Sequence, residues 1–370
     1  MKIGTSRITT IQMIALLSST LIAAGIFTLP RNLAMKVGTP DLWVCVLLGG
    51  ICGYVSCLLI ISLSLRFERL TFFEYNKLIV GKWIGTSLSA AFIIYALTIG
   101  AFEIRSMGEL TQFYLLEETP LSVILISMYW VAIYLLVGGI SPIARLIELL
   151  TPASIFIFIL VFCLGFKVFE LDNLRPLFGL GPIPVLKGVV PTFLTFSGLE
   201  FLLVFIAMMQ TPKHAKKVAL FGLGIPVSIY LLAVIIITGG LSVDRMKHEK
   251  WPTFALIQEY EYEGVLFERF DSLFLVVWLI QMFTTYVICQ YVAAKGISTL
   301  TRLTYRKANY VLLAVVYILC MIPKDLNQLE KMGSYIGYTS FVFSFAIPAI
   351  LLIIAMARGL KRNDEKQDEA

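Results

Sequence analysis

Long apolar blocks separated by short charged stretches dominate this sequence. Each block holds about 18–28 residues, which is enough for an α-helix to cross a hydrocarbon core of ~30 Å. Charged residues make up 15% of the chain, whereas an average soluble protein carries roughly 25%. No stretch outside the blocks has enough apolar residues to build a core of its own. The sequence therefore predicts one all-α polytopic membrane domain, residues 1–360.

The pattern predicts ten transmembrane helices, and the basic residues predict their orientation. Loops on the cytoplasmic side carry an excess of Lys and Arg. With the N-terminus inside, 18 of the 30 basic residues fall in inner segments, 11 in outer segments and Arg105 within the third span. Both termini are therefore expected on the cytoplasmic side. The predicted spans are 10–35, 41–65, 83–115, 121–138, 143–166, 186–210, 217–241, 271–297, 308–322 and 333–357.

Two of these spans contain residues that interrupt a helix. The first holds Leu21–Pro30 (LIAAGIFTLP), in which Gly25 follows two alanines and Pro30 has no N–H to donate. The sixth holds Thr195–Glu200 (TFSGLE), with Gly198 inside an apolar run. Backbone groups freed at membrane depth persist only where they line a cavity or meet a ligand. Such a pair of interrupted helices indicates a transporter-type binding site at the midplane.

The positions of the interruptions also predict an inverted repeat. Each begins a set of five spans, and an odd number of spans gives the two sets opposite topology. Repeat one is expected at about 10–166 and repeat two at about 186–357. The polar tail 361–370 (KRNDEKQDEA) is expected to be disordered.

Glu200 is a candidate functional carboxylate because it lies about 13 residues into the sixth span, within one turn of Gly198. A carboxylate at that depth must be paired, protonated or in contact with water. Three roles stay open: fixing the broken helix through a backbone N–H, binding a substrate ammonium, or carrying a proton.

The third span places Tyr95, Ile99 and Glu103 on one helix face by their i, i+4 spacing. At ~1.5 Å per residue, Tyr95 is expected near the middle of the membrane and Glu103 near its outer boundary. Glu103 is then either an interface charge or a gating or partner-contact residue. Arg105 and Glu109 share another face and are expected to pair.

The eighth span offers polar residues at mid-depth, chiefly Gln281, Thr284 and Thr285. A threonine in a spanning helix often bonds its own i−4 carbonyl and has no further role. The alternative is that this face, opposite the first interruption, lines a ligand or ion site.

The outer loop 242–270 contains an amphipathic stripe that begins after Pro252. Its apolar residues recur at helical spacing, with glutamates at the other positions. An interfacial helix or a lid over the outer mouth fits this pattern, and so does a surface helix with no role towards a ligand.

Several function classes are disfavoured. The chain has no Ser/His/Asp set, no GxxxxGK[ST] loop and no histidine within a span, so we expect no enzyme and no cofactor. Its six cysteines show no CxxC spacing, which argues against a metal site. The basic residues lie at helix ends and form no stripe, so no nucleic-acid partner is expected.

Several motifs together resemble a known family. They are AAGIFTLP at 23–30, the stretch Glu103–Pro120 (EIRSMGELTQFYLLEETP), SGLEFLLVF at 197–205 and MMQTPKHAKK at 208–217. In these motifs the chain is similar to the B subunits of bacterial spore germinant receptors, which belong to the amino acid–polyamine–organocation superfamily. The resemblance covers essentially the whole chain, and it implies a leucine-transporter-like 5+5 inverted repeat with broken helices 1 and 6.

The resemblance also implies a function. Such subunits sense a small nutrient, commonly an amino acid, in the spore inner membrane, and trigger germination with a membrane-embedded A subunit and a lipoprotein C subunit. From their depth in the third and sixth spans, Glu103 and Glu200 are expected to be gating or coupling residues. The implied ligand pocket comprises Ala24, Gly25, Ile26, Tyr95, Ile99, Ser197, Gly198, Leu199, Thr284 and Thr285.

We therefore expect a sensor for a zwitterionic amino acid with an apolar side chain. Free N–H groups at a helix break suit its carboxylate, and free carbonyls suit its ammonium. The alternative is an autonomous amino acid transporter coupled to protons or cations. The fifth span, 143–166, has no lysine at its middle that would mimic a bound cation, whereas Glu200 keeps proton coupling open.

Overall fold

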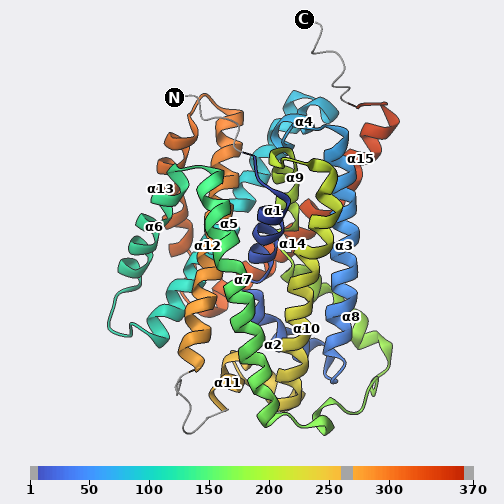
Figure 1. Cartoon of the computed structure of the whole chain (residues 1–370), viewed down its shortest axis with the longest axis vertical. Helices are drawn as coiled ribbons and strands as arrows, with labels where there is room; N and C mark the ends of the chain where they lie inside the picture. Colours follow the sequence, from blue (N-terminus) through green and yellow to red (C-terminus); the bar gives the residue numbers. More distant parts are fainter. Residues whose placement is uncertain (1–6, 260–269, 362–370) are drawn as a thin grey trace, which may run out of the picture.

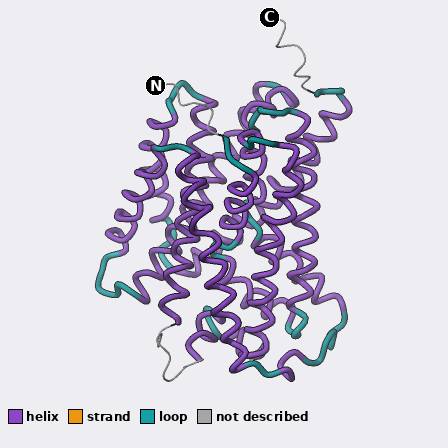
Figure 2. The backbone as a smooth tube through the Cα atoms, viewed as in Figure 1, coloured by secondary structure: helices purple, strands orange, loops and turns teal. Residues whose placement is uncertain are grey.

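The structure, a computed structural model, describes residues 7–259 and 270–361, and within these ranges it is helical with no β-strand. The helices run mostly along the long axis and the loops gather at the two ends (Figure 2). Apart from Lys361, the predicted tail lies outside the described residues. The α-helices are α1 (Thr10–Leu21), α2 (Gly25–Val37), α3 (Leu42–Arg66), α4 (Phe72–Val80), α5 (Lys82–Tyr114), α6 (Leu121–Val137), α7 (Ile140–Leu164), α8 (Pro182–Thr195), α9 (Leu202–Phe205), α10 (Ala215–His248), α11 (Pro252–Glu259), α12 (Phe270–Leu300), α13 (Tyr305–Met321), α14 (Leu326–Phe341) and α15 (Ile347–Ala357).

The predicted spans correspond to ten helical segments of the described chain. Six continuous segments are long and apolar enough to cross a membrane, and two further pairs qualify when each bent pair is one span. The other two segments are α6 and α13, with 17 residues each. One segment continues from α14 into α15 through a π-helical turn, Val342–Ala346.

Capping residues set several helix starts. At α1, the Thr9 hydroxyl accepts the Gln12 N–H at 3.2 Å, and the Gln12 side chain accepts the Thr9 N–H at 3.0 Å. Thr71 and Glu74 cap α4 in the same way. The span pattern treated the α4 segment as a charged connection. It forms a helix because this cap precedes an apolar stripe that buries Phe72 and Phe73.

Figure 1 shows α1 in the middle of the bundle, with α2 below it and α8 towards one side, next to α3. α1 packs against α7, α10 and α12, while α8 packs against α2, α3 and α14. The long helices α5 and α12 pack closely together beside them. α1 begins and α15 ends at the same end of the bundle, here called the proximal end, and the opposite end is called the distal end.

Backbone pairing at the proximal end joins the segment before α1 to residues 208–210. The Ile8 N–H donates to the Met208 carbonyl at 3.0 Å, and the Gln210 N–H donates to the Ile8 carbonyl at 2.9 Å. The Arg69 guanidinium adds a bond to the Met209 carbonyl at 3.1 Å. These contacts tie the start of α1 to the segment that follows the second break.

The loop 242–270 is partly helical at the distal end. α10 continues to His248 past a non-helical residue, Ser242, and α11 follows. Within α11, Phe254, Leu256 and Ile257 are buried against the bundle, so the apolar stripe covers protein. The later part of the predicted stripe, 260–269, lies outside the described residues.

Candidate functional site

Both interrupted helices are broken where the sequence predicts. α1 and α2 meet at an angle of 49° across residues 22–24, and α8 meets the segment Leu199–Met208 at 46°. Gly198 has φ +115°, a left-handed conformation that side chains with a Cβ rarely adopt. The second break therefore depends on this glycine.

The two broken helices touch at their glycines. A Cβ placed on Gly25 would come closer than 3.0 Å to Thr195 of α8 and to the Tyr230 hydroxyl, and one placed on Gly198 would come equally close to Thr20 of α1. The absence of a side chain at each glycine lets the other broken helix approach. The two breaks consequently lie side by side at one depth.

The first break leaves amide donors without backbone partners. Within the described chain, the N–H groups of Ala23, Ala24 and Gly25 have no backbone acceptor. They lie at the start of α2, so the positive end of that helix dipole lies at the same place. This geometry favours an anionic group.

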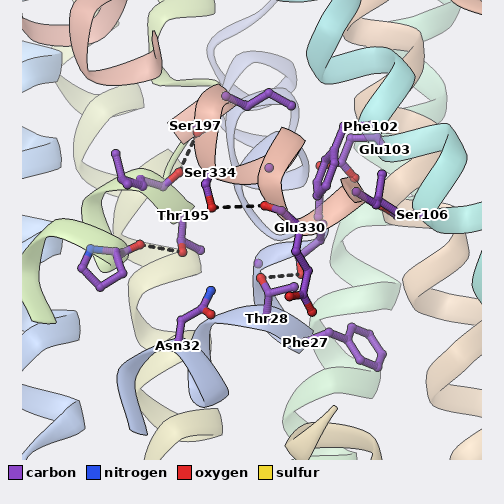
Figure 3. Close-up of a pocket in the computed structure, with 18 of the residues that line it drawn as sticks. Phe27, Thr28, Asn32, Phe102, Glu103, Ser106, Thr195, Ser197, Glu330 and Ser334 are labelled. Atoms are coloured by element: carbon purple, nitrogen blue, oxygen red, sulfur yellow. Dashed lines mark hydrogen bonds between the residues drawn. The ribbon is translucent and has the colours of Figure 1, made fainter. Parts of the chain in front are cut away.

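A cavity of about 560 Å³ extends from the breaks to the distal end. Its walls come from α1, α2, α5, α8, α12 and α14, and the loop before α11 contributes at the mouth. Figure 3 shows Thr195 and Ser197 on one side and Phe102, Glu103 and Ser106 on another, with Thr28 and Asn32 from α2. The residues that line the cavity reach the distal end of the bundle, where Lys36, Lys250 and Trp251 lie.

Glu103 is the cavity residue with the clearest unmet bonding capacity. Its exposed fraction is 6%, and its Oε2 has no hydrogen-bond partner. The carboxyl group lies against the Ala24 amide at the first break. The depth count put Glu103 near the outer boundary, which is wrong because α5 does not begin and end at the membrane boundaries: its 33 residues span about 50 Å, far more than the ~30 Å hydrocarbon core.

Glu200, in contrast, lies outside the cavity wall and is fully bonded. Its Oε1 accepts the Tyr95 hydroxyl at 2.5 Å and the Gly198 N–H at 2.9 Å. Its Oε2 accepts the Ser340 hydroxyl at 3.1 Å. Of the three roles left open, fixing the broken helix through a backbone N–H is the one this geometry supports.

The other residues of the predicted pocket divide into two groups. Those that line the cavity are Ala24, Gly25, Ile99, Ser197 and Thr285. Those that lie behind its wall are Ile26, Tyr95, Gly198, Leu199 and Thr284.

The residues behind the wall support the breaks. Leu199 packs against Gly53 of α3. The Thr284 hydroxyl bonds the Ser19 hydroxyl and its own helix at Gln281, at 2.7 and 2.8 Å. As expected for a threonine in a spanning helix, Thr285 also bonds the Gln281 carbonyl, at 2.9 Å.

Several polar lining residues were missed from the sequence. Asn32 lies one turn beyond Thr28 on α2, and Glu330 lies one turn before Ser334 on α14. The predicted tenth span began at 333, which left Glu330 in a loop. Asp325 caps α14 by accepting the Gln328 N–H at 2.8 Å, and this capping signal was available in the sequence.

An ion pair crosses the mouth of the cavity. Arg31 of α2 lies 3.4 Å from Glu330 of α14, and both side chains are partly exposed. Deeper on α5, Arg105 and Glu109 form the expected pair at 2.7 Å, and Arg105 also donates to the Cys320 carbonyl at the end of α13. Residues 7–259 and 270–361 contain no cluster of three His, Cys, Asp or Glu side chains suited to a metal ion.

Known proteins with similar sequences are spore germination proteins. A family profile described as "Spore germination protein" matches residues 7–329. Spore germination protein YndE of Bacillus subtilis is 38% identical over 96% of this chain and 98% of its own length. Spore germination protein A2 of the same organism is 36% identical over 95% and 96%.

Solved structures with a similar fold are transporters with the leucine-transporter fold. MHP1, a nucleobase-cation-symport-1 family transporter, aligns with a TM-score of 0.64 and 13% identity, over 94% of this chain and 78% of its own. MhsT in complex with L-phenylalanine aligns with a TM-score of 0.66 and 11% identity, over 95% and 89%.

The fold comparison confirms the leucine-transporter-like architecture with broken helices 1 and 6. Family and fold are both of the permease type. The family profile matches most of the chain, and two relatives are more than 30% identical to it over nearly their full length. This integral membrane protein is therefore a member of the spore germination protein family.

Proposed function

We propose that this chain is the nutrient-sensing subunit of a spore germinant receptor and binds a small zwitterionic amino acid in the cavity beside the first break. Its partners would be the membrane-embedded A subunit and the lipoprotein C subunit. It would lie in the spore inner membrane with its proximal end, and both termini, towards the cytoplasm. The family and the transporter fold support this proposal.

One observation carries the choice of ligand: an unpaired carboxylate oxygen and unpaired amide donors lie next to each other. Glu103 Oε2 has no partner, and the N–H groups of Ala23 and Gly25 have no acceptor. An amino acid has its ammonium and carboxylate on one carbon, so it needs complementary partners only a few ångströms apart. The break amides suit the carboxylate and Glu103 suits the ammonium.

The walls around this point favour an apolar ligand side chain. Ile99 and Phe102 of α5, Phe27 of α2 and Trp278 of α12 line the same part of the cavity. Burying apolar ligand surface against these side chains contributes about 25 cal/mol per Å² before the costs of binding. The polar side chains Asn32 and Glu330 lie nearer the distal mouth.

A sensor requires that the ligand prefer one conformation of the chain. A ligand shifts an equilibrium only by its difference in affinity for the two states. In the conformation described here, the residues that line the cavity reach the distal end. A ligand that draws Glu103 and the first break together would favour a closed state, which partner subunits would detect.

The test uses the purified chain in liposomes with tritiated alanine, valine, leucine and phenylalanine. Binding and accumulation are measured separately. Glu103→Gln removes the charge and should weaken binding about 10- to 100-fold, the range expected for a hydrogen bond to a charged partner. Gly25→Leu should abolish binding because its side chain would meet Thr195 and Tyr230. Glu118→Gln, an exposed carboxylate on a loop, is the matched control.

Binding without accumulation supports the sensor. Accumulation driven by a pH or sodium gradient would instead support the alternative, an autonomous amino acid transporter. Glu200→Gln would then show whether that carboxylate carries the proton. Unchanged affinity in Glu103→Gln would remove this residue from the ligand site.

A further inference from the structure

The connection between α7 and α8, here called the rim segment (residues 165–181), exposes large apolar side chains. It contains two 3₁₀ turns, Gly165–Val168 and Leu171–Leu174, and Figure 1 shows it at the rim of the distal end. The exposed fractions of its large apolar residues are 57% for Phe166, 58% for Leu171, 54% for Leu177, 50% for Phe178 and 65% for Leu180. A group of large apolar side chains exposed together marks a surface that contacts a membrane or another protein.

Hydrogen bonds hold the rim segment against α10. The Glu170 N–H donates to the Gly239 carbonyl at 3.0 Å, and the Asn173 side-chain amide donates to the same carbonyl at 2.8 Å. A Cβ on Gly239 would come closer than 3.0 Å to the Phe169 ring, so this ring packs directly on the α10 backbone. The rim segment therefore presents its exposed side chains in a defined orientation.

A buried carboxylate holds the rim segment near its second end. Phe178 has φ +52°, a left-handed conformation that residues with a Cβ rarely adopt. Both carboxylate oxygens of Asp41, at the start of α3, accept the Phe178 N–H, at 3.0 and 2.9 Å. Asp41 is fully buried, and the Thr39 hydroxyl donates to it at 2.8 Å. Such backbone persists where the surrounding structure enforces it, and here it leaves half of a phenylalanine exposed.

The exposed apolar side chains continue onto a surface that faces lipid. α8 follows the rim segment directly, and Ile183, Leu186 and Val190 are exposed on one of its faces. Since α8 is the first half of a broken membrane span, this face meets acyl chains. Residues 176–186 contain no charged residue, so the apolar surface passes from the rim segment to α8 without interruption.

The irregular backbone of the rim segment determines its level in the membrane. Non-helical backbone exposed to lipid does not occur in the hydrocarbon core, because its N–H and C=O groups need partners. Water supplies these partners among the headgroups. Arg175 and Lys187, which flank the uncharged stretch, are both exposed, and long basic side chains reach from an apolar surface to a polar one. The headgroup level fits the segment best.

We infer that the rim segment is an interfacial anchor, which inserts Leu177, Phe178 and Leu180 into a lipid surface at the distal end. These side chains should reach about 5–10 Å into the boundary between headgroups and acyl chains. Because α8 leads from the rim segment to the second break, the anchor sets the level of this helix in the bilayer. The inference goes beyond the proposed function and does not depend on it.

The test measures the depth of spin labels on the full-length chain in liposomes of phosphatidylcholine and phosphatidylglycerol. Labels are attached at Leu177→Cys and Leu180→Cys, one at a time, after the exposed Cys52 and Cys163 are replaced by serine. Power-saturation electron paramagnetic resonance then compares collisions with O₂, which is enriched among acyl chains, and with a water-soluble nickel chelate.

Two further labels serve as matched controls. Ile183→Cys on α8 reports a lipid-facing site, and Asp244→Cys near the end of α10, where the side chain is 90% exposed, reports an aqueous site. At Leu177 and Leu180 the ratio of O₂ to chelate collisions should be severalfold higher than at Asp244 and approach the ratio at Ile183.

A second measurement tests the role of Asp41. Asp41→Ala removes the acceptor of the Phe178 N–H, so the Leu180 label should become more mobile and collide more often with the chelate. Asp41→Asn keeps one oxygen for this N–H and should change both readouts less. If Asp41→Ala does not fold, the depth measurement decides alone, because it keeps Asp41 intact.

The outcomes decide between a lipid surface and the other possible occupants. High O₂ and low chelate collisions at both sites support the anchor. Ratios equal to that at Asp244 overturn it, because the segment then lies in water. Shielding from both reagents also overturns it, because a second copy of the chain then covers the segment. Identical Leu180 spectra with and without Asp41→Ala would contradict the positioning role of the carboxylate.

Discussion

Replacing Glu200 with alanine should destabilise the protein strongly, because this carboxyl group holds together three separate parts of the chain. It accepts the Tyr95 hydroxyl of α5, the Gly198 N–H at the second break and the Ser340 hydroxyl of α14. All three donors and Glu200 itself are buried or nearly so. Alanine leaves each donor without a partner.

The size of the effect follows from the three orphaned donors. Each buried polar group left unsatisfied costs about 1–3 kcal/mol, so the loss is at least ~3 kcal/mol for Glu200→Ala. Glutamine keeps an oxygen for Tyr95 and Gly198, and its amide can donate to the Ser340 hydroxyl, which then accepts. Glu200→Gln should therefore cost less than about 1 kcal/mol, because the hydrogen bonds persist.

Thermal unfolding of the purified variants in one detergent tests this difference. At about 2–4 °C per kcal/mol, Glu200→Ala should lower Tm by roughly 6–12 °C, and Glu200→Gln by only a few degrees. Glu118→Ala on an exposed loop controls for loss of a carboxylate. The reasoning is refuted if the Tm of Glu200→Ala lies within 2 °C of that of the unmutated chain, or if both Glu200 variants lower Tm equally.

Two further predictions concern the second break and the mouth. Gly198→Ala should lower Tm by several degrees, because φ +115° disfavours a residue with a Cβ and that Cβ would also meet Thr20. Gly224→Ala is the control, because a Cβ at Gly224 of α10 meets no other atom, and it should leave Tm unchanged. Equal Tm values for the two variants would contradict the role of Gly198. Arg31→Gln should speed ligand dissociation severalfold, because it breaks the Arg31–Glu330 ion pair across the mouth of the cavity. Tm should change by no more than about 2 °C, because a partly exposed ion pair contributes little to stability. An unchanged dissociation rate would show that the pair does not close the mouth.

The sequence was sufficient to predict the spans and both breaks. Apolar block length determines which segments cross a membrane, and Gly25 and Gly198 mark the places where helical backbone is weakest. The pair Arg105–Glu109 was also predictable, because i, i+4 spacing is a local property of a helix. These features depend on residues close together in the chain.

The cavity wall was harder to predict because it depends on contacts between distant segments. Tyr95 and Ile99 share a helix face, yet Ile99 lines the cavity while Tyr95 turns to Glu200 behind it. Side chains that donate to carbonyls of the first break come from α10, α11 and α12, and no local pattern marks Trp278 or Tyr230 as partners of its carbonyls. Depth counted along one helix also misplaced Glu103.

Glu103 and Glu200 differ in how far the structure satisfies their hydrogen-bonding capacity. The sequence gives them different expectations: Glu200 lies within one turn of Gly198 in the sixth span, whereas Glu103 is counted near the outer boundary of the third span. Glu200 receives three hydrogen bonds, and its bonding capacity is spent on holding the second break. Glu103 keeps an open oxygen inside a cavity, beside amides that also lack partners. Because a buried group without a partner is costly, such a pair of complementary open groups persists where a ligand or water completes it. On this ground we propose Glu103 for ligand recognition and Glu200 for the integrity of the broken helix.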